Sequence, residues 1–151
     1  MSTPNLPSET IRQLIEQAKS VRQRAYAPYS HYYVGAALLG ENGDIYTGCN
    51  VENAAYPVGI CAERSAVVKA ISEGCLAFQA VAVVTENGGT PCGECRQVLN
   101  EFNPDMLVLI ADADGTLLMQ KPLRELLPEG FGPANLNKER VGNRKGQRDG
   151  S

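Results

Sequence analysis

The sequence has little positive charge, and it has no long apolar run. Its 14 lysine and arginine residues are outnumbered by 17 aspartate and glutamate residues, and the resulting formal charge of −3 suits a nucleic-acid backbone poorly. No apolar stretch approaches the ~18 residues of a membrane-spanning helix, and the chain does not begin with a basic-then-apolar leader. We therefore expect a cytoplasmic protein that binds neither membranes nor nucleic acid.

Histidine is nearly absent, with one residue, whereas cysteine occurs five times in 151 residues. In a reducing cytoplasm, cysteines are more often metal ligands or catalytic groups than disulfides. The length predicts a single domain, for which we expect residues 1–136. The polar, glycine-rich remainder, residues 137–151, is predicted to be a disordered tail, and its cluster of Arg144, Lys145 and Arg148 is interpreted as solvated.

Apolar periodicity predicts an α/β fold with a mixed sheet. The predicted helices cover residues 8–26, 61–72, 92–102 and 122–127. The predicted strands cover residues 33–39, 45–46, 79–85, 106–111 and 116–119. Asn42-Gly43 indicates a hairpin in which both central residues have positive φ. Asp114-Gly115 indicates a tight turn that makes the fifth strand antiparallel to the fourth.

Three cysteines have the spacing of a metal site. Cys92 and Cys95 are three positions apart, so on a helix they face the same ion. Cys61 follows Pro57 and Gly59, which suggests another helix start. Structural zinc sites normally use four protein ligands, whereas catalytic sites keep one position open. Three cysteines therefore predict one catalytic Zn²⁺ per chain.

Glu63 is the predicted proton carrier beside this metal. Residues two positions apart point in different directions within a helix, so Cys61 and Glu63 can share a site only if Cys61 begins its helix. A helix N-terminus also favours thiolates through its free N–H groups and partial positive charge. Arg64 is expected to offset the remaining negative charge without binding the metal itself.

Other interpretations of these cysteines remain open at this point. A Cys-x-x-Cys pair alone also suits a redox dithiol. A structural or non-catalytic zinc module would need a fourth ligand, but His31 lies in a predicted loop and Cys49 and Cys75 lack suitable spacing. Those two cysteines are interpreted as small buried hydrophobic residues.

Several segments together resemble the small, zinc-dependent cytidine deaminases, which pair a ligand-x-Glu motif with a later Pro-Cys-x-x-Cys. The resemblance covers about residues 10 to 136. The segments that carry it are Tyr26-Ala27-Pro28-Tyr29-Ser30, Val34-Gly35-Ala36-Ala37-Leu38, Gly48-Cys49-Asn50-Val51-Glu52-Asn53-Ala54, Cys61-Ala62-Glu63-Arg64, Pro91-Cys92-Gly93-Glu94-Cys95-Arg96-Gln97-Val98-Leu99 and Leu126-Leu127-Pro128. It implies a three-layer αβα sandwich with a five-stranded mixed sheet whose fifth strand is antiparallel.

The resemblance also assigns substrate contacts. It implies that Asn50 and Glu52 bind the ribose hydroxyls, although such a pair also suits a polar turn, and that the Ala62 N–H binds the pyrimidine carbonyl. Tyr32 replaces a phenylalanine that stacks near the base. Phe131 matches an aromatic residue that closes a neighbouring subunit's pocket, although a lone aromatic is more often part of a core. Glu94 departs from the pattern, because small residues are common at its position.

The activity implied is hydrolytic deamination of cytidine and deoxycytidine to uridine and deoxyuridine, with release of ammonia, in pyrimidine salvage. The family resemblance further implies a homotetramer with active sites shared between subunits. One alternative substrate is another aminated ring, such as a cytosine-bearing antibiotic. An editor of single-stranded nucleic acid is disfavoured, because residues 106–119 leave no room for the helix that such relatives insert there.

Overall fold

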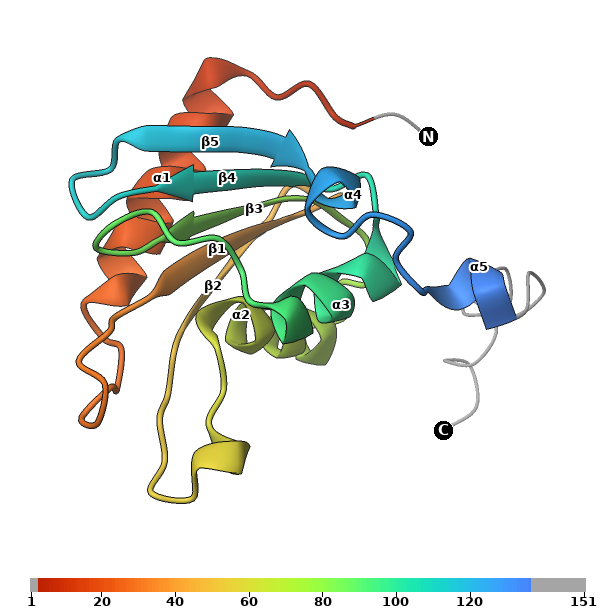
Figure 1. The fold of residues 1–151 in the computed structure, drawn as a ribbon. Coiled ribbons are helices and arrows are strands. Elements are labelled where there is room, and N and C mark those ends of the chain that lie inside the picture. The colour runs from red at the N-terminus through yellow and green to blue at the C-terminus, as the bar shows by residue number, and fades with distance from the viewer. Residues whose placement is uncertain (1–2, 137–151) are drawn as a thin grey trace.

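The computed structural model describes residues 3–136 (Figure 1). The predicted tail over residues 137–151, with its basic cluster, lies outside this range. The helices are α1 (Ser8–Arg22), α2 (Ala62–Ser72), α3 (Gly93–Phe102), α4 (Leu123–Leu126) and α5 (Pro133–Leu136), with a 3-10 turn η1 (Tyr56–Val58) before α2. The strands are β1 (Gly35–Gly40), β2 (Ile45–Cys49), β3 (Phe78–Val84), β4 (Leu107–Ala111) and β5 (Leu117–Pro122).

The five strands form one mixed sheet in the order β2-β1-β3-β4-β5. Strands β3 and β4 are parallel, whereas the pairs β1–β2, β1–β3 and β4–β5 are antiparallel. The predicted mixed sheet with an antiparallel fifth strand is therefore confirmed. The parallel pair needs a crossover, and α3 provides it.

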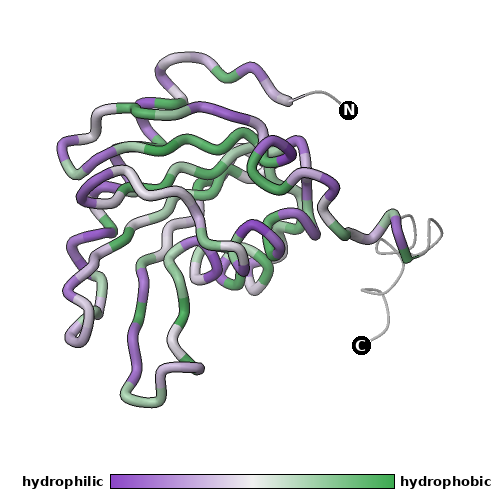
Figure 2. The backbone as a smooth tube through the Cα atoms, viewed as in Figure 1, coloured by the Kyte–Doolittle hydropathy of each residue, from purple (hydrophilic) through white to green (hydrophobic). Residues whose placement is uncertain are grey.

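Helices cover both faces of the sheet, which gives the predicted three layers (Figure 1). Alternate residues of the central strands enter two separate cores. In β3, Val81 and Val83 pack on the side of α2 and α3, while Ala80 and Ala82 pack on the side of α1. The central strands are accordingly the most continuously apolar part of the chain in Figure 2. No helix among the described residues is long and apolar enough to cross a membrane.

The β1–β2 hairpin forms as predicted, but its turn conformation differs from the prediction. Of the two residues Asn42 and Gly43, Gly43 has a positive φ, at 88°, and Asn42 does not. The Gly43 N–H donates to the Gly40 carbonyl at 3.0 Å, so Glu41 and Asn42 are the central residues of the turn. The Asn42 side chain also accepts from the Asp44 N–H at 3.0 Å and donates to the Tyr46 hydroxyl at 2.9 Å. These contacts favour a turn that places one glycine, rather than two residues, at positive φ.

Several element boundaries also differ from the predictions, most at the ends of α1, β2 and β5. Strand β2 reaches Cys49 rather than residue 46. Helix α1 ends at Arg22 rather than at residue 26. Beyond it the Tyr26 N–H donates to the Asn50 carbonyl at 3.0 Å, and Tyr26 forms a parallel bridge with Val51, so tertiary pairing competes with helix continuation. Strand β5 extends to Pro122, opposite Leu107, although Gln120 and Lys121 near its end are polar and exposed. An edge strand exposed on one side carries too weak an apolar pattern to mark its end.

Gly48 sets how closely α2 packs on the sheet. A Cβ atom there would lie 2.4 Å from the Ala66 nitrogen and 2.7 Å from the Ala62 carbonyl oxygen, both in the α2 backbone. We expect Gly48→Ala to push α2 away and to lower the free energy of unfolding by about 1–3 kcal/mol, the usual cost of overpacking. Urea unfolding would measure this loss. Gly93→Ala is the control, since a Cβ there meets no atom within 4 Å, and an equal loss in both variants would contradict the prediction.

Candidate active site

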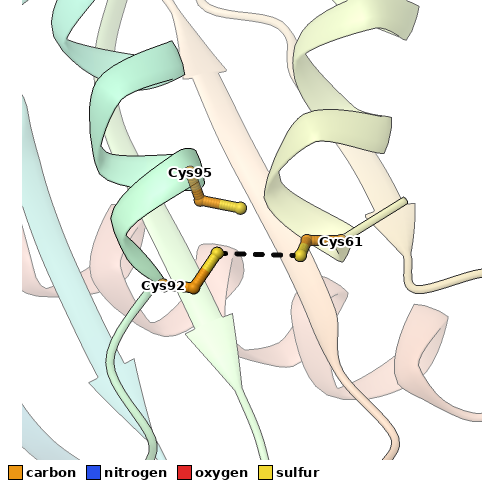
Figure 3. Close-up of side chains that lie close together, drawn as sticks. All are labelled: Cys61, Cys92 and Cys95. Carbon is orange, nitrogen blue, oxygen red and sulfur yellow. Dashed lines mark hydrogen bonds between the residues drawn. The ribbon is translucent and has the colours of Figure 1, made fainter. Parts of the chain in front are cut away.

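Three cysteine sulfur atoms converge between the first turns of α2 and α3 (Figure 3). Cys61 is the N-cap of α2 and Cys92 the N-cap of α3, both with extended backbone, and Cys95 follows in the first turn of α3. The three sulfur atoms lie within 4.8 Å of one another, and those of Cys61 and Cys92 are 3.9 Å apart. Cys61 therefore begins its helix, which was the condition for sharing a site with Glu63.

The electrostatic surroundings favour a thiolate at this cluster. The pKa of Cys61 is lowered to about 5 by a hydrogen bond from Cys95 and, further, by hydrogen bonds from Arg64 and Cys92. The Arg64 Nη2 atom lies 3.8 Å from the Cys61 sulfur and 3.4 Å from a carboxylate oxygen of Glu94. Conversely, the pKa of the Cys95 thiol is raised, first by its hydrogen bond to Cys61 and then by burial. The cluster thus pairs an acidic Cys61 thiol with a buried Cys95 thiol that donates to it.

A zinc ion fits this donor set. Its positive charge would stabilise the thiolate forms of the three side chains, and thiolates are among its preferred ligands. Arg64 and two helix N-termini supply further positive potential around the sulfur atoms. Within the described residues, the three cysteines are the one cluster of metal-binding side chains of this size. Cys61, Cys92 and Cys95 thus form a three-ligand zinc site, with no fourth protein ligand among the described residues.

Glu63 is buried beside the cysteines. Only 4% of its surface is exposed, and it lies in the first turn of α2. Burial raises the pKa of its carboxyl, because desolvation disfavours the charged form, and a hydrogen bond with Cys95 opposes part of this effect. A raised pKa favours a carboxyl that can release a proton as well as accept one, as an acid–base catalyst must.

The raised pKa of Glu63 predicts how the stability of the metal-free protein changes with pH. The unfolded glutamate loses its proton near its ordinary pKa of 4.5, whereas the folded one keeps its proton to higher pH. Between these values Glu63 binds fewer protons in the unfolded state, so its contribution to stability falls as pH rises. We expect chelator-treated Glu63→Gln protein to melt above the wild type at pH 8 and near it at pH 5. A constant difference across this range would contradict the prediction.

A cavity of about 300 Å³ opens beside the cluster. The residues that line it come from four segments of the chain and include most of the predicted site residues. They are Ser30, Tyr32, Val34, Asn50, Val51, Glu52, Gly59, Ile60, Cys61, Ala62, Glu63, Thr85, Gly89, Thr90 and Cys92. None of these side chains is basic, so a neutral ligand suits the cavity better than an anionic one.

Asn50 and Glu52 hold the segment that carries Tyr32. The Asn50 side chain accepts from the Val34 N–H at 2.9 Å and donates to the Tyr32 carbonyl at 2.8 Å. One Glu52 carboxylate oxygen accepts from the N–H groups of Tyr29 and Ser30 at 3.0 and 3.1 Å, and the other from the Ser30 hydroxyl at 2.5 Å. These bonds, with that of the Ser30 hydroxyl first, lower the pKa of Glu52, so it stays ionised. The sequence did not predict this anchoring role.

Phe131 lies apart from this cavity. Its side chain is 57% exposed, and its carbonyl accepts from the side chains of Gln97 and Asn100 at 2.8 and 3.1 Å. It is thus not part of a core, one of the alternatives open at the sequence level. Cys75 is buried as predicted, whereas Cys49 is only half-buried, and both lie outside the metal cluster.

The segment between β3 and α3 contributes cavity residues that the sequence reasoning missed. Thr85, the only buried polar residue at the end of β3, accepts the Gly89 N–H at 2.7 Å and so shapes the segment. Arg96 binds its other end, through the Pro91 carbonyl at 2.7 Å and the Thr90 hydroxyl at 2.8 Å. The one local signal for this segment is Thr85 itself, a polar residue at the end of the apolar run 79–85, which lies just beyond β3.

Comparison with known proteins gives a consistent result. A family profile described as the cytidine and deoxycytidylate deaminase zinc-binding region matches residues 8–111. A cytidine deaminase of Sporosarcina psychrophila is 45% identical over 130 residues, covering 84% of this chain and 95% of the relative. A cytidine deaminase of Halalkalibacterium halodurans is 43% identical over 127 residues, covering 82% of this chain and 96% of the relative.

Solved structures agree with these sequence matches. The crystal structure of a cytidine deaminase from Burkholderia pseudomallei superposes with a TM-score of 0.76 at 41% identity, covering 83% of this chain and all of that one. The cytidine deaminase from Mycobacterium tuberculosis gives a TM-score of 0.70 at 36% identity, covering 80% of this chain and 95% of that one. The predicted fold and the predicted zinc site on three cysteines are confirmed.

Proposed function

Because this chain belongs to the cytidine and deoxycytidylate deaminase family, we propose that it deaminates cytidine and deoxycytidine to uridine and deoxyuridine, releasing ammonia. The observation that carries this proposal is the buried Glu63 carboxyl beside three converging cysteine sulfur atoms, at one wall of a cavity. In the cell, this reaction would return pyrimidine nucleosides to use, that is, pyrimidine salvage. A reducing cytoplasm is the proposed location, since all five cysteines are free thiols.

The cavity lining supports an unphosphorylated nucleoside as substrate. The family includes enzymes of cytidine and of deoxycytidylate, which differ by a phosphate. The lining contains the carboxyl groups of Glu52 and Glu63 and no lysine, arginine or histidine. Phosphate recognition normally uses cationic side chains, which this lining lacks, and the ionised Glu52 would repel a phosphate group. The free nucleoside is therefore the better match.

Glu63 is the proposed proton carrier throughout the reaction. When the oxygen of a water molecule bonds to C4 of the ring, Glu63 takes a proton from that water and passes it to the ring nitrogen. It then takes the remaining proton of that water, now on the C4 hydroxyl group, and delivers it to the departing amine as the C4–N bond breaks and ammonia leaves. A bound zinc ion, held by the three cysteines, would make water acidic enough for this attack at neutral pH.

The remaining proposed contacts orient the nucleoside. Ala62 is the first residue of α2, so its N–H has no partner within the helix and is free to donate to the ring carbonyl. Asn50 and Glu52 would bind the ribose hydroxyls with the lone pairs left over from their contacts with residues 29–34. Tyr32 would lie against the pyrimidine ring. Arg64 would keep the pKa of Cys61 low through its contact with the Cys61 sulfur.

A homotetramer is the proposed assembly, with Phe131 completing a cavity of a neighbouring subunit. Phe131 is exposed and does not line the cavity of its own chain, so any contact with substrate needs a second copy. The segment over residues 51–58 adds further exposed apolar side chains, with Tyr56 74% and Val58 66% exposed. Sedimentation at micromolar concentration is expected to give four chains per particle, and a stable monomer would contradict this proposal.

Ammonia release from zinc-quantified protein tests the function. We expect release from cytidine and deoxycytidine, with kcat/KM at least about tenfold lower for their 5′-monophosphates, because the cavity lacks a cation. Equal or better use of the monophosphates would overturn the substrate assignment. Release from neither nucleoside by protein with one zinc per chain would overturn the function itself, and a panel of other aminated rings would then be assayed.

A further inference from the structure

A hydrogen bond joins two of the four segments that line the active-site cavity. Tyr32 belongs to the segment over residues 30–34, and Asn87 to the segment between β3 and α3. The Tyr32 hydroxyl donates to the side-chain oxygen of Asn87 at 3.0 Å. Both segments line the cavity, the first through Tyr32 itself and the second through Gly89 and Thr90. The bond therefore links two of the segments that line the cavity.

The backbone of Tyr32 is already fixed by other contacts. Its N–H donates to the Ser30 hydroxyl at 3.1 Å, and its carbonyl accepts from the Asn50 amide at 2.8 Å. The Tyr32 backbone is thus fixed by Ser30 and Asn50, while the hydroxyl end of its ring is held by Asn87. Since 38% of the Tyr32 surface is exposed, packing alone does not fix that end.

Gly89 leaves the space that the Tyr32 hydroxyl occupies. A Cβ atom at position 89 would lie 2.7 Å from the hydroxyl oxygen and 3.8 Å from the side-chain oxygens of Asn87 and Thr85. The absence of a side chain at position 89 therefore leaves room for the Tyr32 hydroxyl to reach the Asn87 amide. The phenylalanine that the family resemblance places at position 32 has no hydroxyl and cannot make this bond.

We propose that Asn87 is a positioning residue that acts through Tyr32 to hold the cavity at the width of the substrate ring. The role of the ring as substrate rests on the proposed function. Without the bond, the tyrosine ring gains rotational freedom that substrate binding must remove, which weakens binding. The bond touches neither Glu63 nor the cysteines, so it acts on KM rather than on kcat.

Steady-state kinetics of three variants tests the proposal. Tyr32→Phe and Asn87→Ala are each expected to raise KM for cytidine about 3- to 10-fold, the equivalent of one ordinary hydrogen bond. In both variants kcat should stay within about twofold of the wild type. Because both changes remove the same bond, the double variant should resemble either single one. Additive effects, or an unchanged KM in Asn87→Ala, would overturn the proposal.

Two further variants separate positioning from a general structural effect. Asn87→Asp keeps a side-chain oxygen that accepts from the Tyr32 hydroxyl, so its KM should stay within about twofold of the wild-type value. Asn42→Ala removes another bond between an asparagine and a tyrosine hydroxyl, that to Tyr46 in the β1–β2 hairpin, and should leave KM unchanged. A raised KM in either variant would overturn the assigned role.

Gly89→Ala provides an independent test of the geometry. The added methyl group would displace the Tyr32 hydroxyl and break its bond, so KM should rise as in Asn87→Ala. In a Tyr32→Phe background no hydroxyl is present, and the same change should have a clearly smaller effect. An equal effect in both backgrounds would contradict the fit described here.

Amide hydrogen exchange keeps the proposal testable even if cytidine is not the substrate. Failure of the proposed function would appear as no ammonia release by the wild type. In that case the backbone amides of residues 86–90 should still exchange faster in both Tyr32→Phe and Asn87→Ala than in the wild type. Their exchange should not change in Asn42→Ala. Unchanged exchange in the first two variants would overturn the inference alone.

Discussion

Replacing Glu63 by glutamine should lower the turnover of cytidine by about 10³-fold or more, while one zinc per chain is retained. Glutamine has nearly the shape of glutamate but cannot carry a proton, and proton transfer by a positioned group typically contributes ~10²–10⁴-fold. The loss should lie at the upper end, since Glu63 is proposed to serve in more than one proton transfer. Ammonia release at saturating cytidine measures the effect, with zinc determined by elemental analysis.

The matched control for this variant is Glu73→Gln. Glu73 follows the last turn of the same helix and is exposed, so the same chemical change there should leave turnover within about twofold of the wild type. Near-normal turnover in Glu63→Gln would remove Glu63 from the reaction. Loss of zinc together with turnover would instead assign Glu63 to the integrity of the metal site.

Replacing Cys61 by alanine should abolish stoichiometric zinc binding and, with it, detectable turnover. Two thiolates from one helix would remain, and loss of one of three protein ligands removes the bridge between α2 and α3. We expect less than about 0.1 zinc per chain after dialysis against a weak chelator. The folded state should persist, because Cys61 contributes little to either hydrophobic core.

Cys49→Ala is the control for this prediction. Cys49 ends β2, is half-buried and lies outside the cluster of sulfur atoms, so its loss should leave the zinc content unchanged. A Cys61→Ala protein that retains one zinc per chain would show that Cys92 and Cys95 find other partners, and the three-cysteine site would then be wrong.

The helix starts of the metal site could be predicted from sequence because each is marked locally. Glycine and proline precede Cys61 or flank Cys92, and apolar periodicity begins directly after each. Strands β3 and β4 could be predicted for a similar reason. Short, near-continuous apolar runs such as residues 79–85 are typical of strands that are buried on both faces of a sheet.

What could not be predicted depends on contacts between distant segments. The Tyr32–Asn87 bond joins residues 55 positions apart, and nothing in either local sequence indicates it. The engagement of Glu52 by Ser30 likewise depends on where two loops meet. Asn42 shows the same limit at short range, because its side-chain bonds decided the turn conformation against the expectation from the Asn-Gly pair.

The placement of the three cysteines has a consequence for the whole chain. Cys61 and Cys92 are 31 positions apart and begin helices on the same face of the sheet, so an ion bound by both closes a long loop that includes α2 and β3. Such a closure acts as a reversible cross-link, restricting the unfolded chain more than a short loop would. The availability of zinc would then affect the stability of the folded chain as well as its catalytic activity.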